Sequence, residues 1–415
     1  MAVNFSKLPP LEPMPENPPS RIVWTIVFFV IVIAGIFMVL LLWPKGEPTQ
    51  TPWFWTCVTV YPLGIATFVV LRRYSVYEGR RLDAIAWNDA RESYVNDVFD
   101  RASRPLGILV ATCRFASEAK DDDFGKLLDG SAKLEPRAAP ESGALPVNAR
   151  WFEKPDTDEG GMRFRNDDER RRYVLAWAFS VAIDAVAEVV RSLPPDLRLK
   201  VQLMLPGVVD TDEALAIWER RWAWTDLRPV QVRLMPETSD LMYADAWLDR
   251  VNRRLDEEAR LLVCVRLNAI CQALPLDGSA ETMVALLVAP EAVCQKFALA
   301  PIAMFHRPNG TDHCAIDDAL ARTLRWGCSK PADIKRIWQG GLDGAGANAV
   351  TKAVVKAGMG AKVADIDYMV GHAGPAAPWF AVACAANGAM QDGAPQLVAT
   401  AGKTGVCFSV MRSVT

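Results

Sequence analysis

The chain has 415 residues and a formal net charge of −3, and its acidic and basic residues are interspersed along its length. Nucleic-acid-binding proteins usually present a basic face, so this charge balance argues against nucleic acid as a partner. Nine cysteines are scattered without a paired framework, which favours buried thiols in a reducing compartment over disulfide bonds.

The N-terminal segment, residues 1–21, is rich in proline, with six prolines between positions 9 and 19. This composition predicts an extended, disordered arm. The alternative is that the arm serves as a proline-rich ligand for a partner protein.

Two uncharged apolar runs follow, over residues 22–44 and 52–71. Each run is about as long as the roughly 20 residues that a helix needs to cross a bilayer. They predict a transmembrane helical hairpin over residues 22–71. Neither run contains Asp, Glu, Lys, Arg or His, which argues for a membrane anchor rather than a transport pathway.

Basic residues that flank the two runs predict the orientation of the hairpin. The tail before the first run carries Lys7 and Arg21, and the loop between the runs carries only Lys45. Four arginines follow the second run, at positions 72, 73, 80 and 81. We therefore expect a two-pass membrane protein, with both termini in the cytoplasm.

A polar helical pattern continues from the membrane as a stalk over residues 72–104, and residues 105–415 predict a cytoplasmic α/β domain. Short apolar strands alternate there with helices, which predicts a sheet covered on both faces. The expected strands are 105–115, 197–205, 229–236, 260–267, 283–289, 301–306, 334–338, 366–370, 396–400 and 406–411. The expected helices are 166–192, 211–222, 241–259, 312–326, 345–358 and 379–389. Residues 117–161, rich in Asp, Lys, Gly and Pro, predict a flexible surface insertion.

Metal binding is not predicted, although three candidate ligands lie close together in the sequence. His306, His313 and Cys314, with Cys328 farther on, are the candidates. Structural zinc sites usually present close Cys/His pairs at loop spacings, and here the residues straddle a strand end and a helix start. A histidine at a strand end is the simpler interpretation of His306.

Two glycine-rich segments also fall short of a nucleotide-binding motif. Residues 401–405 end like a phosphate-binding loop, but Leu397 stands where that motif needs glycine, and a strand rather than a helix follows. Residues 340–346 depart from the dinucleotide fingerprint and lack a convincing ribose-binding acid. Both segments are interpreted as turns, so no cofactor is expected.

The most specific local string is residues 371–379, which follows a predicted strand and opens a helix of small residues. Helix starts offer free N–H groups and a positive dipole, so His372 could face an anion or a carbonyl group. The alternative is a histidine that caps or packs at the helix start.

This string resembles the second-histidine region of ketosynthases in the thiolase superfamily: Gly371-His372, then Gly374-Pro375-Ala376-Ala377, then the helix of small residues. Residues 333–341 are similar to the segment that carries the first histidine of that family, and residues 402–410 resemble its glycine-rich last hairpin. The resemblance covers residues 280–415 and implies a thiolase-like mixed α/β fold.

The chain departs from the catalytic pattern of that family. Gln339 stands where the first histidine would fall, and no cysteine has the alanine-cysteine-serine setting of the nucleophile. Thioester chemistry through a cysteine needs an activated thiolate. We therefore predict a pseudoenzyme with no catalytic residues. If the protein is an enzyme, His372 would act with Cys384 or Cys314.

The function predicted from these features is that of a membrane-tethered, non-catalytic adaptor that binds another protein. The organisation of the chain also resembles accessory proteins of bacterial type VI secretion, which implies a secreted effector or a secretion component as partner. Four tryptophans, at positions 218, 222, 224 and 247, are consistent with an interface or with core packing. The alternative function is a membrane-bound acyl-thioester enzyme of the ketosynthase or thiolase type.

Overall fold

The structure is a computed structural model of the chain. It describes residues 3, 7–15, 17–117, 122, 124–138, 146–153, 164–207, 210–251, 257–271, 273–312 and 314–414. The chain divides into two units, Asn4–Val98 and a second unit of Met1–Val3 with Phe99–Thr415. Each unit is described by itself.

The first unit is built on two long apolar helices. Helix α1 (Arg21–Leu42) is followed by α2 (Pro52–Trp55), a π-helical turn at Thr56–Val60, and α3 (Tyr61–Ala102). The apolar windows of α1 and of the continuous segment Pro52–Ala102 have mean hydropathies of 3.2 and 1.8, so both are long and apolar enough to cross a membrane. No residue of α1 is buried within the protein.

The two apolar helices touch where a glycine faces a proline. A Cβ atom added at Gly35 would lie 2.8 Å from the Cβ of Pro62, so α1 and α3 are in close contact at this point. The Trp43 ring meets the Phe54 ring edge-on, with 4.9 Å between the ring centroids, and this contact closes the connection between the helices. The apolar runs thus form a helical hairpin.

The polar residues expected to continue the second apolar run as a helical stalk over 72–104 are helical as far as Ala102 and belong to α3. The second apolar run continues without a break into the polar residues, giving a helical rod of 51 residues, about 75 Å long. The N-terminal arm, predicted to be extended, has no helix or strand over its described residues 9–15 and 17–20. Its described residues lie along α3, where Arg91 and Trp87 donate hydrogen bonds to the carbonyl oxygens of Pro9 and Pro10.

The second unit contains an 11-stranded sheet among its described residues. The strands are β1 (Leu106–Arg114), β2 (Arg198–Met204), β3 (Gln231–Leu234), β4 (Glu258–Arg266), β5 (Thr282–Pro290), β6 (Ala303–Phe305), β7 (Asn309–Thr311), β8 (Arg336–Gly340), β9 (Lys362–Asp365), β10 (Gln396–Gly402) and β11 (Gly405–Ser413). The helices are α4 (Phe124–Asp129), α5 (Asp167–Ser192), α6 (Thr211–Ala223), α7 (Met242–Val251), α8 (Glu291–Lys296), α9 (Ile316–Trp326), α10 (Gly344–Lys356), α11 (Ile366–Met369) and α12 (Ala377–Asp392).

Apart from β7, which pairs with β11, the sheet consists of two five-stranded halves with the same topology. The strand order is β3-β2-β4-β5-β1 in the first half and β9-β8-β10-β11-β6 in the second. In each half the first three strands are parallel and the last two pairings are antiparallel. The halves meet where β1 pairs antiparallel with β6. This internal repeat makes α7 and α12 equivalent, since each leads into the third strand of its half.

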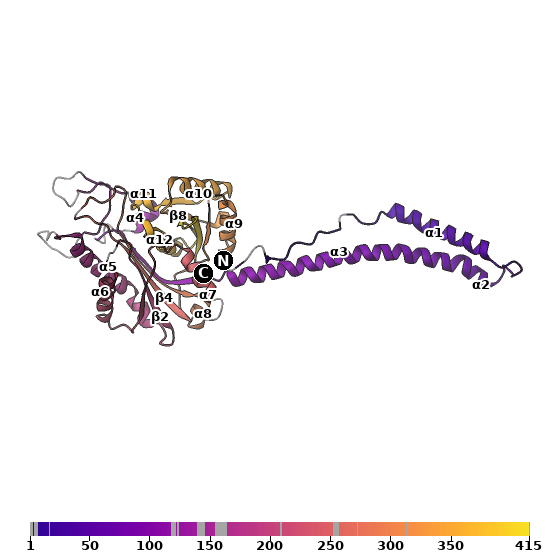
Figure 1. Cartoon of the computed structure of the whole chain (residues 1–415), viewed down its shortest axis with the longest axis horizontal. Helices are drawn as coiled ribbons and strands as arrows, with labels where there is room; N and C mark the ends of the chain where they lie inside the picture. Colours follow the sequence, from indigo (N-terminus) through magenta and orange to yellow (C-terminus); the bar gives the residue numbers. More distant parts are fainter. Residues whose placement is uncertain are drawn as a thin grey trace. The chain divides into compact units, whose positions relative to one another are not determined.

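Helices cover the sheet in layers, and the strands are buried on both faces. Leu261 and Val263 of β4 pack against α5 and α6, whereas Leu262 and Cys264 face the cluster that contains α7 and α12. In the second half, α9 and α10 cover the outer face and α12 the inner face. Figure 1 shows α12 between the two outer helix pairs. The predicted α/β sheet, covered on both faces, is therefore confirmed.

Two predicted elements are wrong in type or extent. Residues 366–370, expected as a strand, form α11, because the side chain of Asp365 accepts a hydrogen bond from the Tyr368 N–H and starts a helical turn. The helix expected over 241–259 ends at Val251, and Glu258 already belongs to β4.

The predicted insertion is partly anchored to the domain. Helix α4 buries Leu127 completely, and Trp151 and Phe152 are buried as well. These apolar side chains hold segments that the polar composition predicts as mobile surface. Residues 118–121, 123, 139–145 and 154–161 of the insertion lie outside the described residues.

Candidate functional site

The candidate site lies at the start of α12, the helix in the middle layer. His372 precedes this helix, and its side chain is 54% exposed. Its Nδ1 atom lies 3.4 Å from Oδ1 of Asp367, on α11. The other carboxylate oxygen of Asp367 accepts the Gly341 N–H at 2.6 Å, which fixes the carboxylate against the loop after β8. The structure therefore pairs the predicted histidine with an acid that the sequence does not single out.

The interaction with Asp367 raises the pKa of His372. Partial burial and the positive charge of Arg266 act in the opposite direction. Arg266 ends β4, and its guanidinium group lies against Gly374, where a Cβ atom would collide with it. Burial lowers the pKa of Arg266. A histidine–carboxylate pair and a guanidinium group therefore flank the entry to α12.

The backbone of His372 is held by the connection between β4 and β5. Its N–H donates to the Gly278 carbonyl at 2.6 Å, and its carbonyl accepts the Ala280 N–H at 3.1 Å. Gly371 has a φ of +112°, and a Cβ atom there would lie 3.0 Å from the Cβ of Ala280. A glycine is thus required before the histidine, because other residues rarely adopt this backbone conformation.

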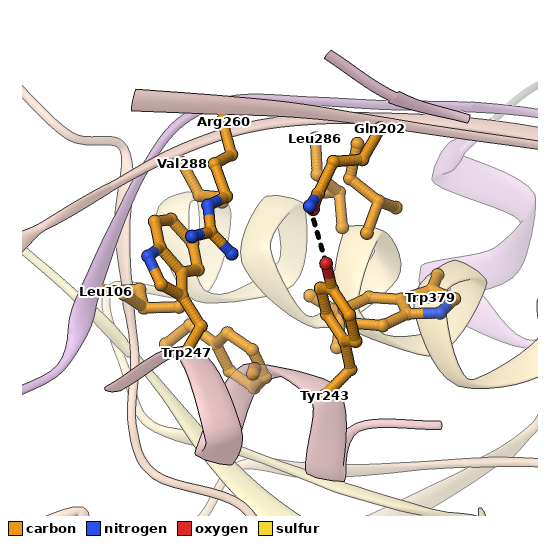
Figure 2. A pocket seen from close by; sticks show the side chains of 12 residues that line it. Leu106, Gln202, Tyr243, Trp247, Arg260, Leu286, Val288 and Trp379 are labelled. Carbon is orange, nitrogen blue, oxygen red and sulfur yellow. Dashed lines mark hydrogen bonds between the residues drawn. The ribbon is translucent and has the colours of Figure 1, made fainter. Parts of the chain in front are cut away.

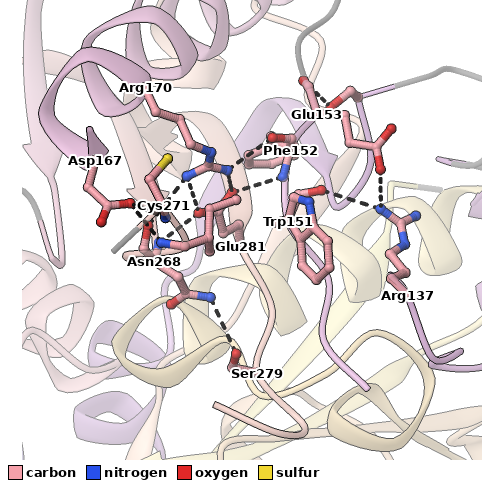
Figure 3. A network of polar contacts seen from close by, with 12 residues as sticks. Arg137, Trp151, Phe152, Glu153, Asp167, Arg170, Asn268, Cys271, Ser279 and Glu281 are labelled. Atoms are coloured by element: carbon pink, nitrogen blue, oxygen red, sulfur yellow. Dashed lines mark hydrogen bonds and ion pairs between the residues drawn. The ribbon is translucent and has the colours of Figure 1, made fainter. Parts of the chain in front are cut away.

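A buried ion pair also holds the connection between β4 and β5 in place. The Glu281 carboxylate accepts hydrogen bonds from Arg170 at 2.9 and 2.6 Å, and from the N–H groups of Phe152 and Asn268 at 2.8 and 2.7 Å. Arg170 and Glu281 are almost completely buried. Figure 3 shows these groups converging on the Glu281 carboxylate. A fully hydrogen-bonded buried pair of this kind fixes the loop beside His372.

A basic cavity lies next to the loop that carries His372. Its volume is about 380 Å³, and it is lined in part by Lys126, Lys133, Arg137 and Arg150, with Glu135 as an acidic lining residue. Arg150 connects the cavity to the loop, because its Nε donates to the Val370 carbonyl at 3.2 Å. Cationic groups in a concave site favour an anionic ligand.

Cys384, the partner suggested for His372, is not placed for catalysis. It is completely buried about two turns inside α12, and burial raises its pKa well above the usual value for a thiol. The other candidate, Cys314, is exposed just before α9. Among the described residues, no cysteine forms a hydrogen bond with His372. A buried thiol with a raised pKa is a poor nucleophile, since the thiolate is the reactive form.

An aspartate side chain occupies the start of α7. This position is equivalent to the start of α12 because the two halves of the sheet repeat the same topology. Asp240 accepts hydrogen bonds from the N–H of Met242 at 3.1 Å and from the N–H of Lys403, in the β10–β11 turn, at 2.8 Å. The helix start therefore already holds a carboxylate. Reasoning from the sequence missed this residue, although an aspartate just before a helix is a recognisable capping signal.

The middle layer contains a second, much smaller cavity, of about 20 Å³. Figure 2 shows Tyr243 and Trp247 of α7 facing Gln202 and Arg260 on the sheet. Gln202 donates a hydrogen bond of 2.5 Å to the Tyr243 hydroxyl, and the Arg260 guanidinium stacks 4.1 Å from the centroid of the Trp247 ring. This volume has room for about one water molecule and not for an acyl chain.

The remaining candidates are placed as follows. Gln339 is buried at the end of β8, and within the described part of the chain its Nε2 has no hydrogen-bond partner. His306 is buried, and burial lowers its pKa to about 4. His313 lies outside the described residues. The described residues contain no group of three or more side chains suited to a metal ion.

Three of the four tryptophans weighed as interface residues belong to the core. Trp218, Trp222 and Trp247 are buried, and the first two stack on each other beneath α5. Trp224 is 68% exposed, and the Arg221 guanidinium lies 4.9 Å from the centroid of its ring. Core packing thus explains all but Trp224.

Comparison with solved structures identifies the fold. A β-ketoacyl synthase from Burkholderia phymatum STM815 aligns with a TM-score of 0.51 at 12% identity, over 75% of this chain and 100% of that chain. The ketosynthase from module 1 of the bacillaene synthase of Bacillus amyloliquefaciens FZB42 aligns with a TM-score of 0.52 at 10% identity, over 76% and 74%. The ketosynthase from module 6 of the bacillaene synthase of Bacillus subtilis 168 gives 0.50 at 11%, over 75% and 72%.

No family model matches the chain, and no curated protein matches it in sequence. The likeness to solved structures therefore concerns the fold, and the role in type VI secretion stays a prediction. The α/β domain has a fold similar to that of these ketosynthases, which agrees with the fold that the resemblance of residues 280–415 implies.

Proposed function

We propose that the protein acts on an acyl thioester at the membrane, with His372 as the acid–base group and without a cysteine nucleophile. The observation that carries this proposal is the His372–Asp367 pair at the start of the middle-layer helix of a ketosynthase-like fold. The names of the similar structures, ketosynthase and β-ketoacyl synthase, denote enzymes that form a β-ketoacyl group, which suggests β-ketoacyl thioesters as the class of compound that the site binds. The alternative function in the sequence analysis was also an acyl-thioester enzyme, with Cys384 or Cys314 as the partner of His372. The fold supports an enzyme of this substrate class over the adaptor, and the burial of Cys384 is the reason that the present proposal omits the cysteine.

The chemistry follows from the environment of His372. We propose hydrolysis: water forms the new bond to the thioester carbonyl carbon, the C–S bond breaks, and a carboxylic acid and a free thiol are released. The raised pKa of His372 keeps more of its imidazole protonated near neutral pH, so it can donate a proton to the leaving sulfur, while the attacking water loses a proton to solvent. During the attack the carbonyl oxygen becomes negatively charged. Negative charge that develops on that oxygen would lie near the N-terminus of α12, which favours anions. The basic cavity beside the loop would hold an anionic part of the substrate.

The helical hairpin is proposed to cross the bacterial inner membrane twice, with both termini in the cytoplasm. This proposal is supported by the length and hydropathy of α1 and of the first part of the Pro52–Ala102 rod. The exposed apolar side chains of α1 would be poorly solvated in water.

Variants of His372 and Asp367 test the enzymatic proposal. The full chain in lipid nanodiscs is assayed for binding and turnover of acetoacetyl-CoA, a short β-ketoacyl thioester. We expect His372→Gln to lower turnover by a factor of about 10² or more. Asp367→Asn lowers the pKa of His372, so the loss of activity as the proton leaves the imidazole moves to lower pH. Cys314→Ser tests the rival mechanism in which this exposed thiol is the nucleophile, and we expect it to keep wild-type activity.

A non-catalytic adaptor is the second candidate, favoured by two observations. The Asp240 carboxylate occupies the start of α7, so the N–H groups it accepts are not available to a substrate. The cavity in the middle layer is too small for an acyl chain. An adaptor would co-purify with a specific partner, and this complex would survive His372→Ala. Absence of acetoacetyl-CoA binding and turnover in the wild-type protein contradicts the enzymatic proposal and leaves the adaptor.

A further inference from the structure

Beyond the N-terminal end of α1, the N-terminal arm covers one face of α3. The side chains on this face are spaced three, four or seven residues apart, so they form a single stripe along the helix. They are Tyr74, Tyr77, Ala84, Asn88 and Arg91. Ala84 is only 1% exposed, although it lies in the polar part of the rod. The N-terminal arm lies along this stripe, and Figure 1 shows it as the indigo coil that runs beside α3 before α1.

Side chains of α3 bind the arm through its main chain. Asn88 makes two hydrogen bonds with Glu12, because its Nδ2 donates to the Glu12 carbonyl and its Oδ1 accepts the Glu12 N–H, both at 3.0 Å. Arg91 Nε donates to the Pro9 carbonyl at 2.6 Å. Two neighbouring contacts follow the same pattern.

These contacts come from aromatic residues. Trp87 Nε1 donates to the Pro10 carbonyl at 3.1 Å, and the Tyr74 hydroxyl donates to the Pro19 carbonyl at 3.2 Å. The arm therefore runs antiparallel to α3, with Pro9 at Arg91 and Pro19 at Tyr74. The ten steps from residue 9 to residue 19 span about 31 Å if the arm is extended as polyproline II, and the helix from 74 to 91 spans about 26 Å. The two lengths agree with an extended arm.

The chemistry matches the recognition of proline-rich peptides. Proline has no N–H, so its carbonyl is its only main-chain hydrogen-bonding group, and indole, phenol and guanidinium groups are suitable donors. Aromatic-lined surfaces recognise such segments because polyproline II is already ordered before binding. The two-point contact of Asn88 with Glu12 then sets the register.

We propose that this stripe of α3 is a binding site for an extended, proline-rich peptide, and that the chain's own arm is its resident ligand. The site is separate from His372 and does not depend on the proposed function. Because the arm is tethered, its effective concentration is in the millimolar range, so a second proline-rich segment binds only when the arm is released.

Hydrogen exchange tests whether the arm is held as described. The full chain in nanodiscs is compared with Asn88→Ala and with the control Ser93→Ala, an exposed change on another face of α3. We expect Asn88→Ala to speed exchange of the Glu12 amide about tenfold, because two hydrogen bonds are lost. Ser93→Ala leaves the rate unchanged. Equal rates in the wild type and Asn88→Ala overturn the proposal.

Peptide binding in trans tests recognition itself. The probe is a fluorescent peptide of residues 7–20, and empty nanodiscs correct for binding to lipid. The receptor is the full chain in which prolines 9, 10, 13 and 15 are replaced by glycine, which weakens its own arm. We expect the peptide to bind this variant at least tenfold more tightly than it binds the wild type, and to lose most of that affinity when Asn88→Ala is added. Failure to bind the glycine variant overturns the proposed site.

Discussion

At the scale of single residues, His306 and His372 show how position decides the chemistry of one residue type. His306 is buried at the end of β6, where loss of hydration disfavours the charged form. His372 is about half exposed and faces the Asp367 carboxylate, which favours the charged form. The local strings separate His306, at the end of a predicted strand, from His372, before a helix of small residues, but only the structure places the Asp367 carboxylate beside His372.

His306 makes the protein sensitive to acid. Its folded-state pKa of about 4 lies below the unfolded value of 6.5, so the neutral side chain stabilises the fold above pH 6.5, and this stabilisation is lost as pH falls toward 4. The difference corresponds to about 3 kcal/mol. Urea unfolding of the full chain in detergent at pH 7 and pH 4.5 measures this loss.

We expect His306→Asn to lose less stability than the wild type between these two pH values. The variant itself costs stability at pH 7, so the comparison is the change with pH within each protein. An equal change in both proteins shows that other groups cause the acid sensitivity.

At the scale of elements, the long connection between β4 and β5 depends on one ion pair. Arg170→Met would leave the buried Glu281 carboxylate without its cationic partner, and breaking such a pair costs about 3–5 kcal/mol. Arg172→Met, two residues along the same helix, is the matched control. The Arg172 side chain is 58% exposed and its partner Glu213 36% exposed, and a solvent-accessible pair is worth at most about 1 kcal/mol. Urea unfolding measures the free energy of unfolding of both variants, and we expect Arg170→Met to lower it by more than Arg172→Met does.

The contact between α1 and α3 depends on the absence of a side chain at Gly35. Gly35→Leu places atoms where Pro62 already lies, so we expect the helices to move apart by roughly 2 Å. Spin labels at the exposed positions 37 and 68 report this distance. Gly64→Leu is the control, because a Cβ atom there meets no other atom within 4 Å. Equal distances in the two variants would mean that the helices do not pack through Gly35.

At the scale of the whole molecule, the proposed topology makes a prediction about accessibility. The loop between α1 and α2 should lie on the periplasmic side, and the α/β domain on the cytoplasmic side. In intact bacterial cells, a membrane-impermeant maleimide should label Glu47→Cys. The exposed native thiols Cys314 and Cys328 should react only after permeabilisation. Labelling of either native thiol in intact cells contradicts the two-pass orientation.

The sequence alone determined those features that depend on neighbouring residues. The apolar runs predict helices of membrane-spanning length, and the apolar strand at residues 260–267 predicts burial on both faces, because composition and periodicity are local properties. The string around His372 predicts the helix start that the structure shows. Even the resemblance to ketosynthases rests on short segments of this kind.

Only the tertiary structure decided which distant residues meet. It paired Arg170 with Glu281 across 111 positions and placed the proline-rich arm on α3. The same strand order occurs in both halves of the sheet, so the start of α7 and the start of α12 are equivalent positions. The Asp240 side chain occupies the first of these positions. The physical reason is that hydrogen bonds and packing between distant segments leave little trace in local composition, since either partner alone is also compatible with an exposed surface.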